Sequence, residues 1–275
     1  MEPTAEWYER QYNPRVTVSH AADLVAGWAN RAQLFRARHT PSADIAYGPH
    51  PRELFDLYRT PDARGAVIYI HGGYWRMLSK FETSWVAEAF LAQGLSVALI
   101  NYPLCPEVTV AEIRHSVQRA FAALWRKHLT AGERRRVVVI GHSAGGHLAA
   151  LHLATDWTGF GLPSDPLAGV VAVSGVFDVE PLVHTSMNQD IRLTAESAAG
   201  LNLIREPVRA RARLLCAVGA VEPEEFHRQS HDLAAAWAVL KPEVFAIPGA
   251  NHFTAIDGLA EPGHALNRAV LEMMA

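Results

Sequence analysis

The sequence predicts an α/β fold in which a mostly parallel central sheet is covered by helices on both faces. Short runs of almost continuous apolar residues, rich in valine and isoleucine, recur along the chain. Such runs are typical of parallel strands that are buried on both faces. Amphipathic stretches with helical spacing lie between them, and alternation of strand with helix favours a doubly wound sheet.

The predicted strands are separated by predicted helices, and ligands are expected beyond the carboxyl ends of the strands. The strands cover residues 66–70, 96–100, 137–140, 169–173, 214–218 and 244–247. The clearest helices cover residues 109–128, 145–155 and 225–240, and residues 1–40 also have a mainly helical pattern.

The composition is typical of a globular protein and excludes several function classes. Of the 275 residues, 49% are hydrophobic and 19% are charged, and the formal net charge is −3. This balance gives no general attraction to nucleic acid or to an anionic membrane. No run approaches the roughly 20 apolar residues that span a bilayer, and residues 1–6 do not have the pattern of a secretory signal.

The two cysteines, Cys105 and Cys216, lie in or beside apolar segments, where we expect buried thiols in a reducing compartment. The sequence therefore predicts a cytoplasmic protein that binds a small-molecule substrate and neither nucleic acid nor membrane. Neither a C-x-x-C pair nor a G-x-G-x-x-G turn after a strand is present, so we predict no metal and no cofactor. Whether the chain forms a homodimer stays open.

A G-x-S-x-G motif follows the predicted strand 137–140 and precedes a predicted helix. It reads Gly141-His142-Ser143-Ala144-Gly145. In this strand–turn–helix context a serine is held on a strained turn with its hydroxyl exposed above the sheet. Bulky residues at 141 and 145 would collide with neighbouring backbone. Ser143 is therefore the predicted nucleophile, and the alternative is a glycine-rich turn in which the serine only caps the helix.

A second glycine-rich turn follows the first predicted strand and reads His71-Gly72-Gly73-Tyr74-Trp75. An H-G-G run at this place supplies backbone N–H groups to the oxyanion hole of lipases and esterases. We expect the oxyanion hole to comprise Gly72, Gly73 and Ala144, and His71 to hold the loop. Taken alone, the run is also compatible with a simple turn.

The general base should follow the last strand in the chain order serine, acid, histidine. His252 has this position, directly after the strand 244–247. The other candidates, His147, His152 and His264, fall within predicted helices, where we expect ordinary core or surface histidines.

The acid should follow the fifth strand, where three glutamates are available. Glu222 lies early in the loop and is preferred, while Glu224 and Glu225 fall at the start of a helix, where a carboxylate suits the helix dipole. Asp178, after the fourth strand, is a further alternative. The acid would orient His252 and stabilise its imidazolium form.

Together these motifs look like the kynurenine formamidase (arylformamidase) branch of the α/β-hydrolase superfamily. The segments that carry the resemblance are residues 71–75 and 141–147, the opening motif Tyr12-Asn13-Pro14-Arg15, the stretch 225–230, and residues 174–178 with Pro181-Leu182. The resemblance covers most of the chain. It implies one α/β-hydrolase domain over residues 1–275, with a short cap-like insertion around 180–207.

Carried over to this sequence, the family pattern implies Ser143 as nucleophile, His252 as base and Glu222 as acid. The family usually has aspartate at the position of Glu222, so the loop must sit further back or another carboxylate must serve. Residues 201–204 lack the Ser-Pro pair expected near the end of the cap, a departure that concerns the substrate pocket more than the chemistry.

The activity implied by the resemblance is hydrolysis of an N-formyl aryl amide. The leading substrate is N-formylkynurenine, an intermediate of tryptophan catabolism, which would give kynurenine and formate. Aromatic side chains expected at the substrate are Tyr74, Trp75, Phe177 and Phe253, although Trp75 is equally compatible with core packing. The alternatives are a carboxylesterase or another small-molecule amidase with the same triad and, more remotely, a non-catalytic ligand-binding protein of this fold.

Overall fold

In the computed structural model, which describes residues 3–275, eight strands form one sheet in the order β1-β2-β4-β3-β5-β6-β7-β8. Their bounds are β1 (Ser42–Ala46), β2 (Leu54–Tyr58), β3 (Ala66–Ile70), β4 (Ser96–Ile100), β5 (Val137–His142), β6 (Gly169–Val173), β7 (Arg213–Gly219) and β8 (Glu243–Ile247). β2 is antiparallel to both of its neighbours, β1 and β4, and all other neighbouring pairs are parallel. The predicted mostly parallel sheet is confirmed.

The six predicted strands correspond to β3–β8, and their predicted ends are correct to within two residues. β3, β4, β5 and β6 are buried along their whole length, which explains their continuous apolar character. The edge hairpin formed by β1 and β2 was not predicted. β1 is almost entirely exposed and therefore carries no apolar pattern.

The helices connect these strands. Their bounds are α1 (Ala5–Tyr12), α2 (Pro14–Thr17), α3 (Ala21–Arg38), α4 (Ala87–Ala92), α5 (Val110–Ala123), α6 (Ala144–Ala154), α7 (Asn188–Ile191), α8 (Ala195–Ala199), α9 (Glu224–Ala236), α10 (Asp257–Ala260) and α11 (Ala265–Met273). The shorter helical turns are η1 (Ser84–Val86), η2 (Leu124–His128), η3 (Glu133–Arg135), η4 (Trp157–Phe160), η5 (Glu180–His184), η6 (Leu203–Arg205) and η7 (Ala238–Leu240).

Three of the predicted helices need small corrections. α5 ends five residues before the predicted end, and the chain continues as one π-helical turn, η2. α9 ends at Ala236 and is followed by the short turn η7. The helical pattern of residues 1–40 is divided among α1, α2 and α3, and residues 1 and 2 of that range lie outside the described part of the chain.

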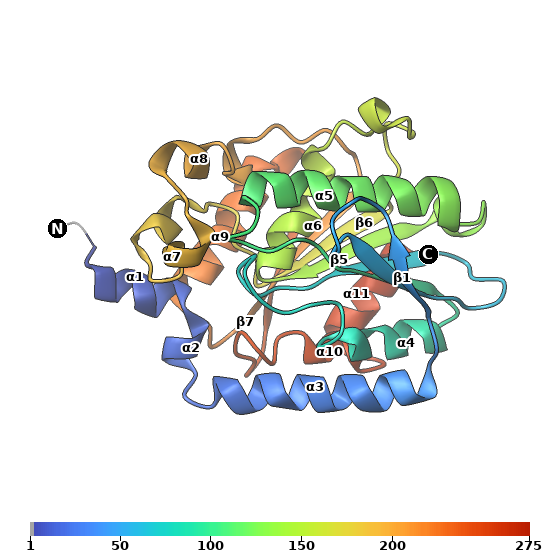
Figure 1. The fold of residues 1–275 in the computed structure, drawn as a ribbon, viewed down its shortest axis with the longest axis horizontal. Helices are drawn as coiled ribbons and strands as arrows, with labels where there is room; N and C mark the ends of the chain where they lie inside the picture. The colour runs from blue at the N-terminus through green and yellow to red at the C-terminus, as the bar shows by residue number, and fades with distance from the viewer. Residues whose placement is uncertain (1–2) are drawn as a thin grey trace.

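Helices cover both faces of the sheet, as predicted (Figure 1). α5, α6 and α9 pack on one face, in the cluster that includes Ile68, Leu148 and Phe226. α3, α4, α10 and α11 pack on the other face, in the cluster that includes Trp28 and Val270. These two layers hold the strands rigidly, so that their carboxyl ends form a fixed edge.

At one end of the molecule, α1, α7 and α8 lie beyond this sheet (Figure 1). The segment 180–207, expected as a cap-like insertion between β6 and β7, consists of η5, α7, α8 and η6. α1 contacts both η5 and α9, which brings the N-terminal segment beside this insertion.

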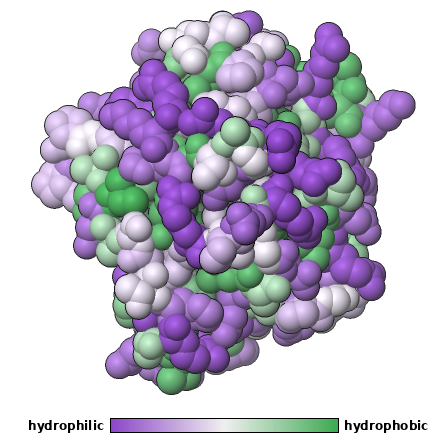
Figure 2. Space-filling view, turned by 90° about the vertical axis from the view of Figure 1, so that its right-hand side faces the viewer, coloured by the Kyte–Doolittle hydropathy of each residue, from purple (hydrophilic) through white to green (hydrophobic). Residues whose placement is uncertain are grey.

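The opposite end of the molecule presents a mainly hydrophilic surface on which hydrophobic residues form small, separate groups (Figure 2). Among residues 3–275, no helix is both long and apolar enough to cross a membrane.

Candidate active site

The turn after β5 holds Ser143 in a strained conformation. Its φ is 56° and its ψ is −121°, a combination that non-glycine residues adopt only when the surroundings enforce it. A Cβ on Gly141 would lie 1.8 Å from the Gly145 carbonyl oxygen, and one on Gly145 would lie 2.1 Å from the Ile70 carbonyl oxygen. The two glycines are therefore required for strand, turn and helix to approach each other so closely.

The Ser143 side chain is available for chemistry. Its backbone N–H donates to the Val173 carbonyl at 2.8 Å, which fixes the turn to β6. Within residues 3–275 the Ser143 hydroxyl has no hydrogen-bond partner, while Ser143 and His252 line the same cavity. Hydrogen bonds between a nucleophile and its base often tighten only when substrate binds.

His252 and Glu222 form a buried hydrogen-bonded pair. The His252 Nδ1 lies 2.7 Å from the Glu222 Oε2, and the exposed fractions of the two side chains are 4% and 0%. The other carboxylate oxygen, Oε1, accepts from the Ser174 hydroxyl at 2.5 Å and from the Gly219 N–H at 2.7 Å. Both carboxylate oxygens thus accept hydrogen bonds, which fixes the orientation of the carboxylate.

The turn after β7 accommodates the extra methylene of Glu222. The Glu222 N–H donates to the Gly219 carbonyl at 3.0 Å while the carboxylate returns to the Gly219 N–H. The Val221 N–H donates to the Ala250 carbonyl at 3.1 Å, which fixes this turn to the loop that carries His252. The side chain therefore folds back over its own turn to reach the imidazole.

The other carboxylates considered for the acid do not contact His252. Asp178 accepts from the Asn202 side chain at 3.0 Å, and burial raises its pKa. Glu224 is exposed at the start of α9. Glu225 is directed toward the N-terminal segment instead.

Glu225 anchors the Tyr12 end of the opening motif. Its carboxylate accepts from the Tyr12 hydroxyl and forms an ion pair with Arg228 at 2.6 Å. Burial opposes ionisation of Glu225, but the hydrogen bonds from Arg228 and Tyr12 outweigh it and lower the pKa. The Tyr74 hydroxyl in turn donates to the Tyr12 carbonyl, so the N-terminal segment is tied to the loop after β3.

The loop after β3, which carries the residues expected in the oxyanion hole, depends on the conformation of Gly73. Gly73 has a φ of +101°, and a Cβ there would lie 2.3 Å from the Met77 carbonyl oxygen. No hydrogen bond found within residues 3–275 uses the Gly73 N–H. The N–H of Ala144, the first residue of α6, is one of the helix N-terminal groups that lack an intrahelical acceptor.

His71 and Gly72 hold that loop against β5. The His71 Nδ1–H donates to the Gly72 carbonyl at 2.8 Å, and the ring stacks on Tyr102 with centroids 4.2 Å apart. Burial lowers the pKa of His71 to about 3, so the ring is neutral near pH 7. A Cβ on Gly72 would lie 2.7 Å from the His142 carbonyl oxygen, a distance that only glycine permits.

His142, which occupies the first variable position of the G-x-S-x-G motif, contacts His252. Its Nε2–H donates to the backbone carbonyl of His252 at 2.8 Å, and the two rings lie 4.9 Å apart. Burial, and then the neighbouring His252, lower the pKa of His142 well below its usual range. Sequence reasoning overlooked both His142 and Ser174, because a variable motif position and a serine after a strand carry no pattern of their own.

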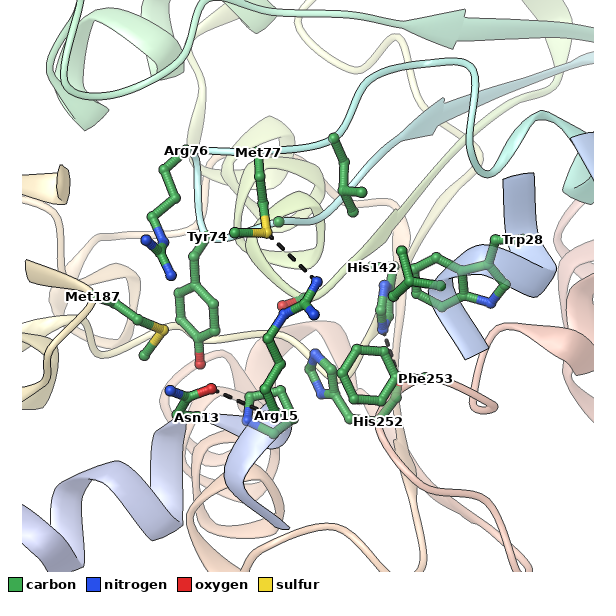
Figure 3. A pocket seen from close by; sticks show the side chains of 15 residues that line it. Asn13, Arg15, Trp28, Tyr74, Arg76, Met77, His142, Met187, His252 and Phe253 are labelled. Carbon is green, nitrogen blue, oxygen red and sulfur yellow. Dashed lines mark hydrogen bonds between the residues drawn. The ribbon is translucent and has the colours of Figure 1, made fainter. Parts of the chain in front are cut away.

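Ser143 and His252 open onto a cavity whose lining is mainly apolar and aromatic (Figure 3). Tyr74 and Phe253, two of the expected substrate-binding residues, line it together with Trp28. The complete lining is Asn13, Pro14, Arg15, Val25, Trp28, Gly73, Tyr74, Arg76, Met77, Leu78, His142, Ser143, Met187, His252 and Phe253.

Trp75 and Phe177, the other two expected substrate-binding residues, do not line this cavity. Trp75 is fully buried and packs edge-on against His147, with ring centroids 5.4 Å apart. Phe177 is fully buried too, and its ring fills the space beside Gly175. Both are core residues, because the turns that carry them direct their side chains inward.

Within residues 3–275, no group of three or more histidine, cysteine, aspartate or glutamate side chains is arranged to hold a metal ion. His227 and His231 lie one turn apart on α9 but have no third ligand of these types.

Several known proteins are similar to this chain in sequence and in fold. A protein-family model described as BD-FAE matches residues 55–213. The kynurenine formamidase of Danio rerio is 30% identical over 289 aligned residues, which cover 98% of this chain and 93% of the relative. The crystal structure of a candidate thioesterase from Silicibacter sp. TM1040 has a TM-score of 0.85 and 31% identity, and covers 96% of this chain and 97% of that one.

The fold alone extends to more distant enzymes. A hyperthermophilic esterase from Pyrobaculum calidifontis has a TM-score of 0.72 at 15% identity, covering 93% of this chain and 92% of that one.

Proposed function

Because the chain belongs to the kynurenine formamidase branch of the α/β-hydrolase superfamily and is a hydrolase, we propose that it cleaves an N-formyl aryl amide through an acyl-serine intermediate. N-formylkynurenine is the leading substrate. The observation that carries the proposal is the hydrogen bond between His252 and the buried Glu222, together with the position of His252 beside Ser143 at one cavity.

In the first half of the reaction, the Ser143 oxygen attacks the formyl carbon and His252 takes the hydroxyl proton. The negative charge that develops on the formyl oxygen is stabilised by the N–H groups of Gly73 and Ala144, with Gly72 beside them. Glu222 stabilises the imidazolium. The carbon–nitrogen bond then breaks, and His252 gives the proton to the departing aryl amine.

In the second half, water attacks the formyl-serine ester while His252 takes one of its protons. The bond between the formyl carbon and the Ser143 oxygen breaks, and the proton returns to that oxygen. Formate leaves and the enzyme is restored. His142 and Ser174 act as positioning residues, since each holds one member of the pair by a hydrogen bond.

The lining of the cavity supports an aromatic substrate. Trp28, Tyr74 and Phe253 offer ring surfaces against which an aryl group can pack. An aryl amine is also a better leaving group than an alkyl amine, so an esterase-type triad suffices for this amide.

An esterase acting on small acyl esters or thioesters is the second candidate. It is favoured by the full-length likeness to the candidate thioesterase at 31% identity. The same three side chains would carry out that reaction.

The test compares kcat/KM for N-formylkynurenine, p-nitrophenyl acetate and acetyl-coenzyme A with the purified protein. Efficient deformylation that is lost in Ser143→Ala is the expected result. Ser164→Ala is the matched control, because Ser164 is exposed and does not line the cavity.

Ester or thioester cleavage with negligible deformylation would reject the formamidase proposal and favour the second candidate. Deformylation that persists in Ser143→Ala would reject the acyl-serine mechanism.

A further inference from the structure

The active-site cavity contains positive charge but no carboxylate. Two arginines, Arg15 and Arg76, are among its lining residues, and no aspartate or glutamate is. A cavity with this lining favours a ligand that is partly apolar and carries a negative charge.

Arg76 is already paired. Its guanidinium forms an ion pair with Asp190 on α7, so most of its charge is neutralised within the protein. It therefore contributes less to ligand binding than its position suggests.

Arg15 has no such partner. Within residues 3–275, no carboxylate oxygen lies within 4.0 Å of its side-chain nitrogens. Its side-chain contact is the thioether sulfur of Met77, 3.8 Å from Nη2, and a thioether is a weak acceptor. Most of the five guanidinium donors are thus available. Figure 3 shows the side chain extending from α2 toward Met77, between Tyr74 and His252.

The backbone that carries Arg15 is held firmly, unlike that of an ordinary surface arginine. The Asn13 side chain caps α2 by accepting from the Arg15 N–H at 3.2 Å. The buried Pro14 occupies the first position of that helix. Tyr12 is fixed by Glu225 through its hydroxyl and by Tyr74 through its carbonyl. This anchoring lowers the entropy that Arg15 loses on binding a ligand.

We propose that Arg15 binds the carboxylate of the substrate while Ser143 attacks the formyl carbon, so that Arg15 is the residue that determines the preference for an acid over its neutral analogue. The inference rests on the proposed deformylation and assigns a specificity-determining residue to the same site. A guanidinium can donate two parallel hydrogen bonds to a carboxylate, which gives both orientation and affinity.

The test uses two substrates that differ only in charge, N-formylkynurenine and its carboxamide. We expect wild type to prefer the acid by about 10- to 100-fold in kcat/KM, the range for a hydrogen bond to a charged group. Arg15→Met should remove this preference and leave the carboxamide rate within about 2-fold of wild type. Arg15→Lys should retain part of the preference, because it keeps the charge without the paired donors.

The matched control is Arg10→Met, which removes an exposed arginine of α1 that does not line the cavity, and it should retain the full preference. Equal loss on both substrates in Arg15→Met would overturn the proposal, because it would assign Arg15 a structural role. A wild type without preference for the acid would overturn it as well.

Failure of the deformylation itself gives a different pattern. If wild type cleaves neither formamide but cleaves aryl esters, the same variants are compared on 3-acetoxybenzoate and 3-acetoxybenzamide. A preference for the anionic ester that disappears in Arg15→Met supports the carboxylate site and rejects only the formamidase function. No preference there overturns the site.

Discussion

Glu222 divides its two carboxylate oxygens between the His252 ring and the turns that surround it. One oxygen accepts from His252, and the other accepts from the Ser174 hydroxyl and the Gly219 N–H. The second set of bonds restrains the carboxylate while its other oxygen contacts the imidazole. A glutamate can thus replace the usual aspartate without loosening the pair.

Glu222→Gln should lower kcat about 10³- to 10⁴-fold, the scale seen when the triad acid is replaced by its amide. The amide cannot stabilise the imidazolium of His252, and it favours the wrong tautomer. The measurement is kcat for N-formylkynurenine, with circular dichroism as a check of folding. Glu224→Gln, a change of an exposed neighbour, should leave kcat unchanged, and a Glu222→Gln variant within 10-fold of wild type would reject Glu222 as the acid.

At this scale the sequence was informative where chemistry imposes a pattern. Ser143 and His252 were found because motif and chain order restrict them. Ser174 and His142 were not found, because each contacts a residue that is far away in the sequence, and no sequence motif links the two partners. Trp75 was ambiguous for the same reason, since only the turn that carries it decides which way the ring points.

Among the elements, the loop after β3 depends most on a single residue. Gly73 has a left-handed φ and a close contact with the Met77 carbonyl, so an L side chain would displace the backbone that carries the oxyanion donors. The strain is local, because His71 and Tyr102 hold the base of the loop independently.

Gly73→Ala should lower kcat about 10²- to 10³-fold, the effect of losing one oxyanion donor. Its free energy of unfolding should fall by about 1–3 kcal/mol, the cost of a strained φ and ψ. Gly27→Ala in α3 is the control, because nothing lies within 4 Å of the added Cβ. That variant should keep full activity and gain about 0.5–1 kcal/mol of stability. A fully active Gly73→Ala variant would show that the loop does not supply the oxyanion hole.

The strands were predictable where an uninterrupted apolar run marks them in the sequence. β3–β6 are buried throughout, and the sequence located them well. β1 is exposed, and the apolar run of β2 is interrupted by the buried charged residue Asp56, so hydrophobic periodicity could not separate these strands from a loop. The division of residues 1–40 into separate helices depends on the cap formed by Asn13 and on Pro14. Hydrophobic periodicity over a long window does not detect such local breaks.

Across the whole molecule, buried neutral histidines couple stability to pH. Burial lowers the pKa of His147 to about 3 and that of His152 to about 4, from an ordinary value of 6.5. Each folded-state pKa is below the unfolded one, so the unfolded chain binds a proton first as the pH falls. The stability that these groups provide is complete above about pH 6.5 and is lost progressively toward pH 4.

Between pH 6 and pH 5, each such histidine should lower the free energy of unfolding by about 1.4 kcal/mol per pH unit. Urea denaturation at several pH values measures this slope. His152→Gln should reduce the slope by about that amount. Leu148→Ala, which removes a buried side chain that does not titrate, should lower stability by about 2–5 kcal/mol at every pH and leave the slope unchanged. An unchanged slope in His152→Gln would contradict this explanation.

We propose Ser143 as the nucleophile, activated by His252 and Glu222. The most direct measurement is mass spectrometry of the protein after reaction with a fluorophosphonate, with the labelled peptide sequenced. We expect one label per chain, on Ser143, with turnover lost in proportion to labelling and labelling slowed strongly in Glu222→Gln. A label on another residue, or full turnover by a labelled protein, would contradict it.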